Sequence, residues 1–107
     1  MSDATIVSQS SDRFVVEVDG RPAGLARFAE RDGRRVFFHT EVGDEFEGQG
    51  LASTLVRQAL DRTREDGLRV VAVCPYVKRW VEKHDGYADL TEQPTGEDLD
   101  AVRAAGG

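Results

Sequence analysis

The chain has 107 residues, of which 39% are hydrophobic and 32% are charged, and its formal net charge is −6. This length suits one globular domain and is too short for two, and the composition excludes global disorder. The negative charge, without a basic stripe, speaks against nucleic-acid binding; it suits either a cationic amine substrate or solubility alone.

The first half of the chain predicts three strands joined by tight turns. The apolar residues Phe14, Val16 and Val18 alternate with Arg13, Val15 and Glu17, which is typical of a half-buried strand. The Asp19-Gly20 pair that follows favours a type I′ hairpin, because both central residues of such a turn need positive φ. Further strands are predicted over 23–30 and 35–42, so this half should form an antiparallel meander.

The second half changes to helical spacing. Apolar residues recur three and four positions apart from Leu51, which predicts a helix over 51–65. The apolar run at 68–74 is typical of a strand covered on both faces. Pro75 is expected to open a second helix that ends near residue 86.

The end of the chain predicts two short elements, a strand at 87–90 and a helix within 95–105 whose capping box consists of Thr95 and Asp98. The strands at 36–42 and 70–74 should be parallel, with the first helix as a right-handed crossover. The predicted fold class is therefore α/β, a mixed sheet built from an antiparallel meander and a βαβ unit. We expect a single domain over 1–107 with its core at about 13–90.

The loop between the third strand and the first helix has the features of an anion site. The helix begins without a Ser, Thr, Asp or Asn cap, so its first N–H groups need partners. An anion suits them because the helix dipole also points at it, and Gly48 and Gly50 leave the backbone open to approach. The alternative is an ordinary glycine loop with water at the helix end. Neither a Walker A lysine nor a third dinucleotide-type glycine is present.

The single cysteine, Cys74, excludes an internal disulfide and is typical of a reducing compartment. The first residues lack the basic stretch and long apolar run of a signal peptide, and no segment has the pattern of a membrane span. We therefore expect a cytoplasmic protein that does not enter a membrane. The residues do not distinguish a monomer from a dimer.

The loop Glu47–Ala52 resembles the Arg/Gln-x-x-Gly-x-Gly/Ala loop of the GNAT acetyltransferases. Downstream, Trp80–Tyr87 resembles the ending of helix, glycine and aromatic in that family. More narrowly, His39–Val42 and Cys74–Val77 are similar to segments of small stand-alone GNAT-like domains. The resemblance covers roughly 15–90 and implies a minimal version of the GNAT-like acyl-CoA-binding fold.

This resemblance implies that acetyl-CoA is the co-substrate and that no metal is needed. The pantetheine arm would lie between the strands ending at Val42 and Cys74, and the Val42 N–H would polarise the thioester carbonyl. The sequence departs from the family pattern at Glu47, usually Arg or Gln, and at Val81, where larger members often carry Tyr. The backbone N–H groups expected to hold the pyrophosphate are those of Gly48, Gln49, Gly50, Leu51 and Ala52.

Three side chains are candidates for the chemistry of transfer to an amine. Glu41, next to Val42, is either a general base acting through a water or a solvated strand carboxylate. Cys74 is either an acceptor nucleophile or thiol acid, or an inert buried residue. Tyr76 either donates a proton to the thiolate or packs as an aromatic. His39 and His84, with no third ligand in sight, do not indicate a metal site.

The leading functional hypothesis is an N-acetyltransferase in which an amine attacks the thioester directly in a ternary complex. Its acceptor would be a small-molecule or protein amine that the residues do not specify. The alternative is a non-catalytic domain that binds acyl-CoA or a protein partner. A third hypothesis, a redox-active thiol protein, would depend on Cys74 alone.

Overall fold

The computed structural model describes residues 5–46 and 50–106 of the chain. These residues form one six-stranded sheet whose spatial order, β1 to β6, is the order of the sequence. Neighbouring strands from β1 to β4 are antiparallel, and β4, β5 and β6 are parallel. The strands are β1 Thr5–Gln9, β2 Arg13–Val18, β3 Arg21–Arg31, β4 Arg34–Val42, β5 Arg69–Ala72 and β6 Thr91–Glu92.

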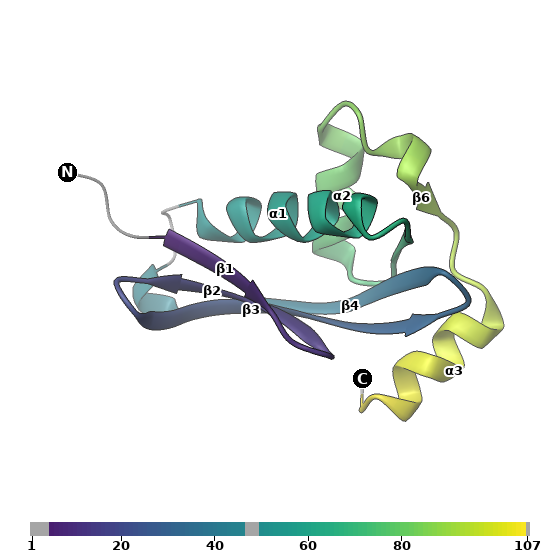
Figure 1. Ribbon diagram of the computed structural model, residues 1–107, viewed down its shortest axis with the longest axis horizontal. Coiled ribbons are helices and arrows are strands. Elements are labelled where there is room, and N and C mark those ends of the chain that lie inside the picture. The colour runs from purple at the N-terminus through teal and green to yellow at the C-terminus, as the bar shows by residue number, and fades with distance from the viewer. Residues whose placement is uncertain (1–4, 47–49, 107) are drawn as a thin grey trace.

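Three α-helices cover the two faces of this sheet: α1 Leu51–Glu65, α2 Pro75–Lys83 and α3 Gly96–Ala104. Helices α1 and α2 lie on one face and α3 on the other, as Figure 1 shows. Two 3₁₀ turns, Asp44–Phe46 and Ala88–Leu90, complete the described elements. None of the described helices has the length and hydrophobicity that a membrane crossing requires. The predicted mixed α/β sheet with a parallel β4–α1–β5 unit is confirmed.

The predicted meander is present because its turns carry the residues that their backbone conformation demands. Asp19 and Gly20, between β2 and β3, have φ of 52° and 80°. Asp32 and Gly33, between β3 and β4, repeat the pattern with 48° and 74°. Two central residues with positive φ match the twist of antiparallel strands. The sequence therefore indicated both hairpins correctly.

Two strands differ from the prediction. β1 was not predicted; it is an edge strand that pairs only with β2, so its extended form depends on a partner rather than on its own short sequence. The strand predicted at 87–90 is wrong, because Ala88–Leu90 forms a 3₁₀ turn and β6 follows it. Tyr87 and Leu90 are both buried, and the Leu90 N–H donates to the Tyr87 carbonyl. A spacing of three residues puts both side chains on one side of a turn.

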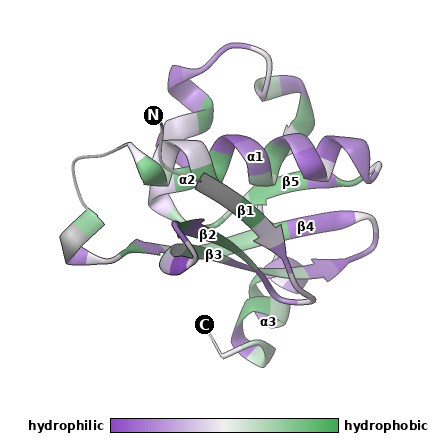
Figure 2. Cartoon of the chain, turned by 60° about the vertical axis from the view of Figure 1, so that its left-hand side comes forward, coloured by the Kyte–Doolittle hydropathy of each residue, from purple (hydrophilic) through white to green (hydrophobic). Residues whose placement is uncertain are grey.

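The main core lies between the sheet and helices α1 and α2. Phe14, Phe28 and Phe37 come from three neighbouring strands, and their ring centroids are 5.3 to 6.2 Å apart. The largely hydrophobic β5 is covered on both faces, as its apolar run predicts (Figure 2). The α1 residues buried against this core are Leu51, Leu55, Val56, Ala59, Leu60 and Thr63.

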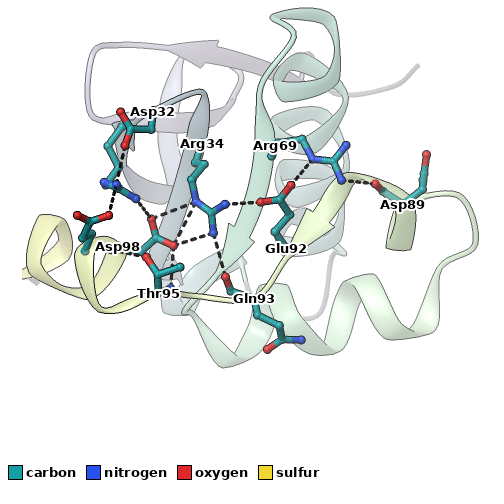
Figure 3. Close-up of polar contacts among 10 residues, drawn as sticks. Asp32, Arg34, Arg69, Asp89, Glu92, Gln93, Thr95 and Asp98 are labelled. Carbon is teal, nitrogen blue, oxygen red and sulfur yellow. Dashed lines mark hydrogen bonds and ion pairs between the residues drawn. The ribbon is translucent and has the colours of Figure 1, made fainter.

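Helix α3 is attached to the opposite face of the sheet by a buried carboxylate. Asp98, fully inaccessible, accepts hydrogen bonds from Arg31 at 2.6 Å and from Arg34 at 2.8 Å. Arg34 also contacts Glu92 of β6, so one cluster joins β4, β6 and α3 (Figure 3). Thr95 and Asp98 form the predicted capping box. Val102 then packs against residues of β4 and β5 in a small second core.

Candidate active site

Strands β4 and β5 separate after a short parallel stretch. Their pairing ends at Phe37, whose carbonyl accepts hydrogen bonds at 2.9 Å from the N–H groups of both Val73 and Cys74. The next residue, Phe38, is a bulge with no counterpart on β3. β4 continues to Val42 paired with β3 alone. A cleft therefore opens on the side of β4 that has lost its partner.

The Val42 N–H points toward this open side. Gly43 donates its N–H to Ala23 of β3 at 2.8 Å. Successive N–H groups of an extended strand point to opposite edges, so the preceding N–H, that of Val42, points away from β3. This is the direction that the predicted role of Val42 as a carbonyl donor requires.

The same cleft receives the N-terminus of α1. Gly50 is the N-cap residue, with φ of 72°, and no side chain caps the helix. Thr54 donates to the Gly50 carbonyl, but no described residue accepts from the N–H groups of 51–53. These groups carry the positive end of the helix dipole. The predicted anion-binding character of Gly50, Leu51 and Ala52 agrees with this geometry, whereas Gly48 and Gln49, like Glu47, lie outside the described residues.

We call this hollow the β4–β5 cleft, and its volume is about 390 Å³. It brings together three of the predicted site elements, namely the end of β4, the start of α1 and the first turn of α2. Phe46 and Ser53, which the sequence analysis did not single out, contribute to its wall. Its lining residues are Thr40, Glu41, Val42, Phe46, Gly50, Leu51, Ala52, Ser53 and Tyr76.

Glu41 is positioned as an accessible carboxylate at the rim of this cleft. It pairs with Leu25 across the sheet, whereas Val42 pairs with Gly24, so the two side chains point to opposite faces. Its Oε1 lies 2.8 Å from His39 Nε2, and 60% of its side chain is exposed. His39 and Glu41, two residues apart on β4, therefore share one face of the strand. Such a carboxylate can reach an amine through a water.

Tyr76 and Cys74 differ in their access to the cleft. Tyr76 is half-buried and lines it, and burial raises the pKa of the Tyr76 hydroxyl above its ordinary 10.0. This hydroxyl therefore stays protonated near neutral pH. Cys74 is the N-cap residue of α2, but it is buried and does not line the cleft. Its thiol lies 3.4 Å from the Thr40 hydroxyl across the gap between the strands.

The first turn of α1 is fixed by a contact that sequence reasoning missed. The buried Trp80 donates its indole N–H to Ser53 Oγ at 2.9 Å. The His84 ring stacks on Trp80 with the centroids 3.9 Å apart, while His39 contacts Glu41 instead. Within the described ranges, no group of three or more His, Cys, Asp or Glu is placed to hold a metal.

The sequence of this chain matches the family model of the GCN5-related N-acetyltransferases over residues 13–90. The chain belongs to this family. The divergence of β4 and β5 over the N-terminus of α1 is therefore a feature of a GNAT domain. The sequence resemblance implied this family. Helix α3 lies beyond the matched residues.

Comparison with known proteins gives relatives of this GNAT domain. It is 32% identical over 74 residues to Protein NATD1 from Bos taurus, an alignment that spans 67% of this chain and 66% of that protein. It is 41% identical over 61 residues to spermidine N(1)-acetyltransferase from Escherichia coli (strain K12), spanning 55% of this chain and 33% of that enzyme. The chain therefore spans about two thirds and one third of the length of these relatives.

Solved structures share the fold. A GCN5-like protein from Staphylococcus aureus, determined by NMR, superposes with a TM-score of 0.64 and 25% identity, covering 85% of this chain and 91% of that one. The ribosomal-protein-S18-alanine N-acetyltransferase from Escherichia coli superposes with a TM-score of 0.52 over 58% of this chain and 42% of that one. At 20% identity the latter likeness concerns the fold alone.

Proposed function

We propose that this domain transfers an acetyl group from acetyl-CoA to an amine. The observation that carries the proposal is the uncapped N-terminus of α1, which opens into the β4–β5 cleft at Gly50. A Cβ at Gly50 would meet no atom of the described residues within 4 Å, its chain neighbours aside, so a ligand can approach the backbone at this point. The N–H groups of Gly50, Leu51 and Ala52 would hold the pyrophosphate.

The bound co-substrate would supply the acetyl group as an activated thioester. Its pantetheine arm fits the side of β4 that has lost its partner, where backbone groups are free to pair with it. The Val42 N–H, which points to that side, would donate to the thioester oxygen as negative charge develops there. The backbone would thus supply the fixed dipole that stabilises the negative charge on the thioester oxygen.

Two side chains, Glu41 and Tyr76, would accept and donate the protons of the reaction. The acceptor nitrogen forms a bond to the acyl carbon while the carbon–sulfur bond breaks. The proton lost by the nitrogen would pass through a water to the Glu41 carboxylate, whose accessible position suits this role. The leaving thiolate would take a proton from Tyr76, which lines the cleft and whose hydroxyl stays protonated.

The acceptor is expected to be a cationic amine. The chain carries a net charge of −6, which raises the local concentration of cations. Glu41 presents its carboxylate at the rim of the cleft, and Glu17 lines a neighbouring hollow on the same face of the sheet. One relative carries spermidine in its name. Polyamines are therefore the first acceptors to assay, followed by peptide N-terminal amines.

A second candidate function is acyl-CoA binding without turnover. It is favoured by Val81, which the sequence resemblance aligns with the proton-donating tyrosine of larger family members. Val81 is buried in the core and has no group to titrate. The two functions separate in one assay, because a binder that does not turn over releases no free coenzyme A thiol when an amine is added.

The first test is the melting temperature with and without acetyl-CoA. Ligand at about 100 times its dissociation constant adds roughly 2.7 kcal/mol to the free energy of unfolding. For a domain of this size that should raise the melting temperature by about 10 °C or more. Adenosine should produce no such rise. A melting temperature unchanged at millimolar acetyl-CoA would contradict the proposed function.

Glu41→Gln should lower kcat by about a hundredfold or more, because a positioned general base contributes on this scale. Acetyl-CoA affinity should not change, since backbone N–H groups, and not this carboxylate, would hold the co-substrate. Glu17→Gln is the matched control, because Glu17 lies on the same face but does not line the β4–β5 cleft. An unchanged kcat in Glu41→Gln would show that Glu41 is an ordinary solvated carboxylate and not the general base.

Cys74→Ala should keep its rate of transfer within about twofold of the wild type. The thiol is buried next to Thr40, and Cys74 does not line the cleft, so direct attack by the amine does not need it. The measurement is steady-state transfer, together with a search for acetylated cysteine by mass spectrometry. Lost transfer with intact acetyl-CoA binding would instead indicate an acyl-cysteine route.

A further inference from the structure

Helix α2 carries an unusual group of cations for so acidic a chain. Both lysines of the sequence, Lys78 and Lys83, are on this helix, with Arg79 between them. Within the described part of the chain, none of the three forms an ion pair. Most arginines do form one, namely Arg13, Arg31, Arg34, Arg35, Arg62, Arg64, Arg69 and Arg103. Among the residues that the structure describes, no carboxylate therefore neutralises these three charges.

Two of these cations face a hollow next to the β4–β5 cleft. Arg79 and Lys83 are one helical turn apart, which puts them on the same side of α2. They line a space of about 380 Å³, which we call the α2 hollow. The hollow shares two of its residues with the β4–β5 cleft, so the two spaces are adjacent. Its lining residues are Ser53, Tyr76, Arg79, Trp80, Lys83 and His84.

The walls of the α2 hollow offer hydrogen-bond donors and no carboxylate. Ser53 accepts a hydrogen bond from Trp80, and this contact fixes its hydroxyl oxygen and leaves its proton to be donated. Arg79 and Lys83 add two positive charges. Like charges one turn apart weaken a helix unless something lies between them to neutralise them. A phosphate group would do so and would accept all of these donors.

We propose that the α2 hollow binds the ribose 3′-phosphate of coenzyme A. This inference rests on the proposed function, which assigns the pyrophosphate to the backbone at the start of α1. Coenzyme A carries one further phosphate, a monoester that is close to dianionic at neutral pH. The Arg79 guanidinium and the Lys83 ammonium both suit that group, and Ser53 places the hollow directly beside the pyrophosphate site. The domain should therefore distinguish coenzyme A from 3′-dephospho-coenzyme A.

The test compares the dissociation constants of these two ligands. Both can be titrated calorimetrically, or by the fluorescence of Trp80, which is the only tryptophan of the chain and touches Ser53. The wild type should bind coenzyme A about tenfold or more tightly than the dephospho form, as charge-assisted hydrogen bonds to phosphate imply. The double variant Arg79→Gln/Lys83→Gln should bring this ratio close to one. Each single variant should lower the ratio partway.

Lys78→Gln is the matched control. It removes the same charge from the same helix, but Lys78 lines a different hollow, together with residues of β5 and β6. Its ratio should equal that of the wild type. If the wild type binds both ligands equally well, or the double variant keeps the full ratio, the 3′-phosphate site is wrong while the proposed function stands. Failure of both ligands to bind would overturn the proposed function and this site with it.

Discussion

Gly50→Glu should abolish acetyl-CoA binding in a protein that still folds. Gly50 has φ of 72°, at the point where α1 opens into the β4–β5 cleft. A side chain there would enter the space proposed for the pyrophosphate, and its negative charge would oppose the phosphates at the helix N-terminus. We expect the affinity for acetyl-CoA to fall by at least about a hundredfold, because the ligand can no longer reach the N–H donors and the helix dipole at the start of α1. The measurement is the acetyl-CoA-dependent shift in melting temperature.

The backbone strain of this substitution has a matched control in Gly33→Glu. Gly33 has nearly the same φ, 74°, and a Cβ there would likewise meet no protein atom within 4 Å. It lies in the β3–β4 hairpin, outside the β4–β5 cleft. Both variants should lose about 1 kcal/mol of stability from the left-handed conformation. Only Gly50→Glu should lose binding; equal binding by both variants would contradict the assignment of the site.

Asp98→Ala should lower the free energy of unfolding by about 3 kcal/mol, because it removes the buried carboxylate that accepts from both Arg31 and Arg34. Asp98 is completely buried between Arg31 and Arg34 and also caps α3 (Figure 3). Urea denaturation measures the loss. Asp100→Ala on the same helix is the control, since its ion pair with Arg103 is exposed and should contribute less than about 1 kcal/mol. Equal losses would show that Asp98 has no special role.

The contribution of Asp98 should also depend on pH. Burial alone raises the pKa of Asp98, but hydrogen bonds from Arg34, the Thr95 N–H and Arg31 outweigh it and hold the pKa well below the ordinary 3.8. A carboxyl whose folded-state pKa is lowered stabilises the protein above its unfolded pKa and loses this effect as the pH falls toward the folded value. The difference between wild type and Asp98→Ala should therefore be constant near neutral pH and shrink below about pH 4.

The amino-acid sequence alone predicts the elements whose signals are local. The two Asp-Gly turns specify the hairpins through their own φ preferences, and the stripe from Leu51 specifies α1 through its period. Pro75 opens α2, and Thr95 caps α3 with its own side chain. Each of these signals lies within a few residues of the structure that it predicts. The order strand, helix, strand over β4, α1 and β5 also predicts a parallel pair, because a helical crossover between such strands has one favoured hand.

Features that join distant parts of the chain depend instead on how the whole domain packs. An edge strand such as β1 exists because β2 supplies its hydrogen bonds. The β4–β5 cleft depends on where these two strands separate. The Phe37 carbonyl accepts from both Val73 and Cys74 at this point, and no residue type in the sequence predicts that contact. The sequence likewise does not predict the hydrogen bond from Trp80 to Ser53, or those from Arg31 and Arg34 to Asp98. Such contacts are selected by the packing of the whole domain, because a side chain's partner depends on which surfaces the folded backbone brings together.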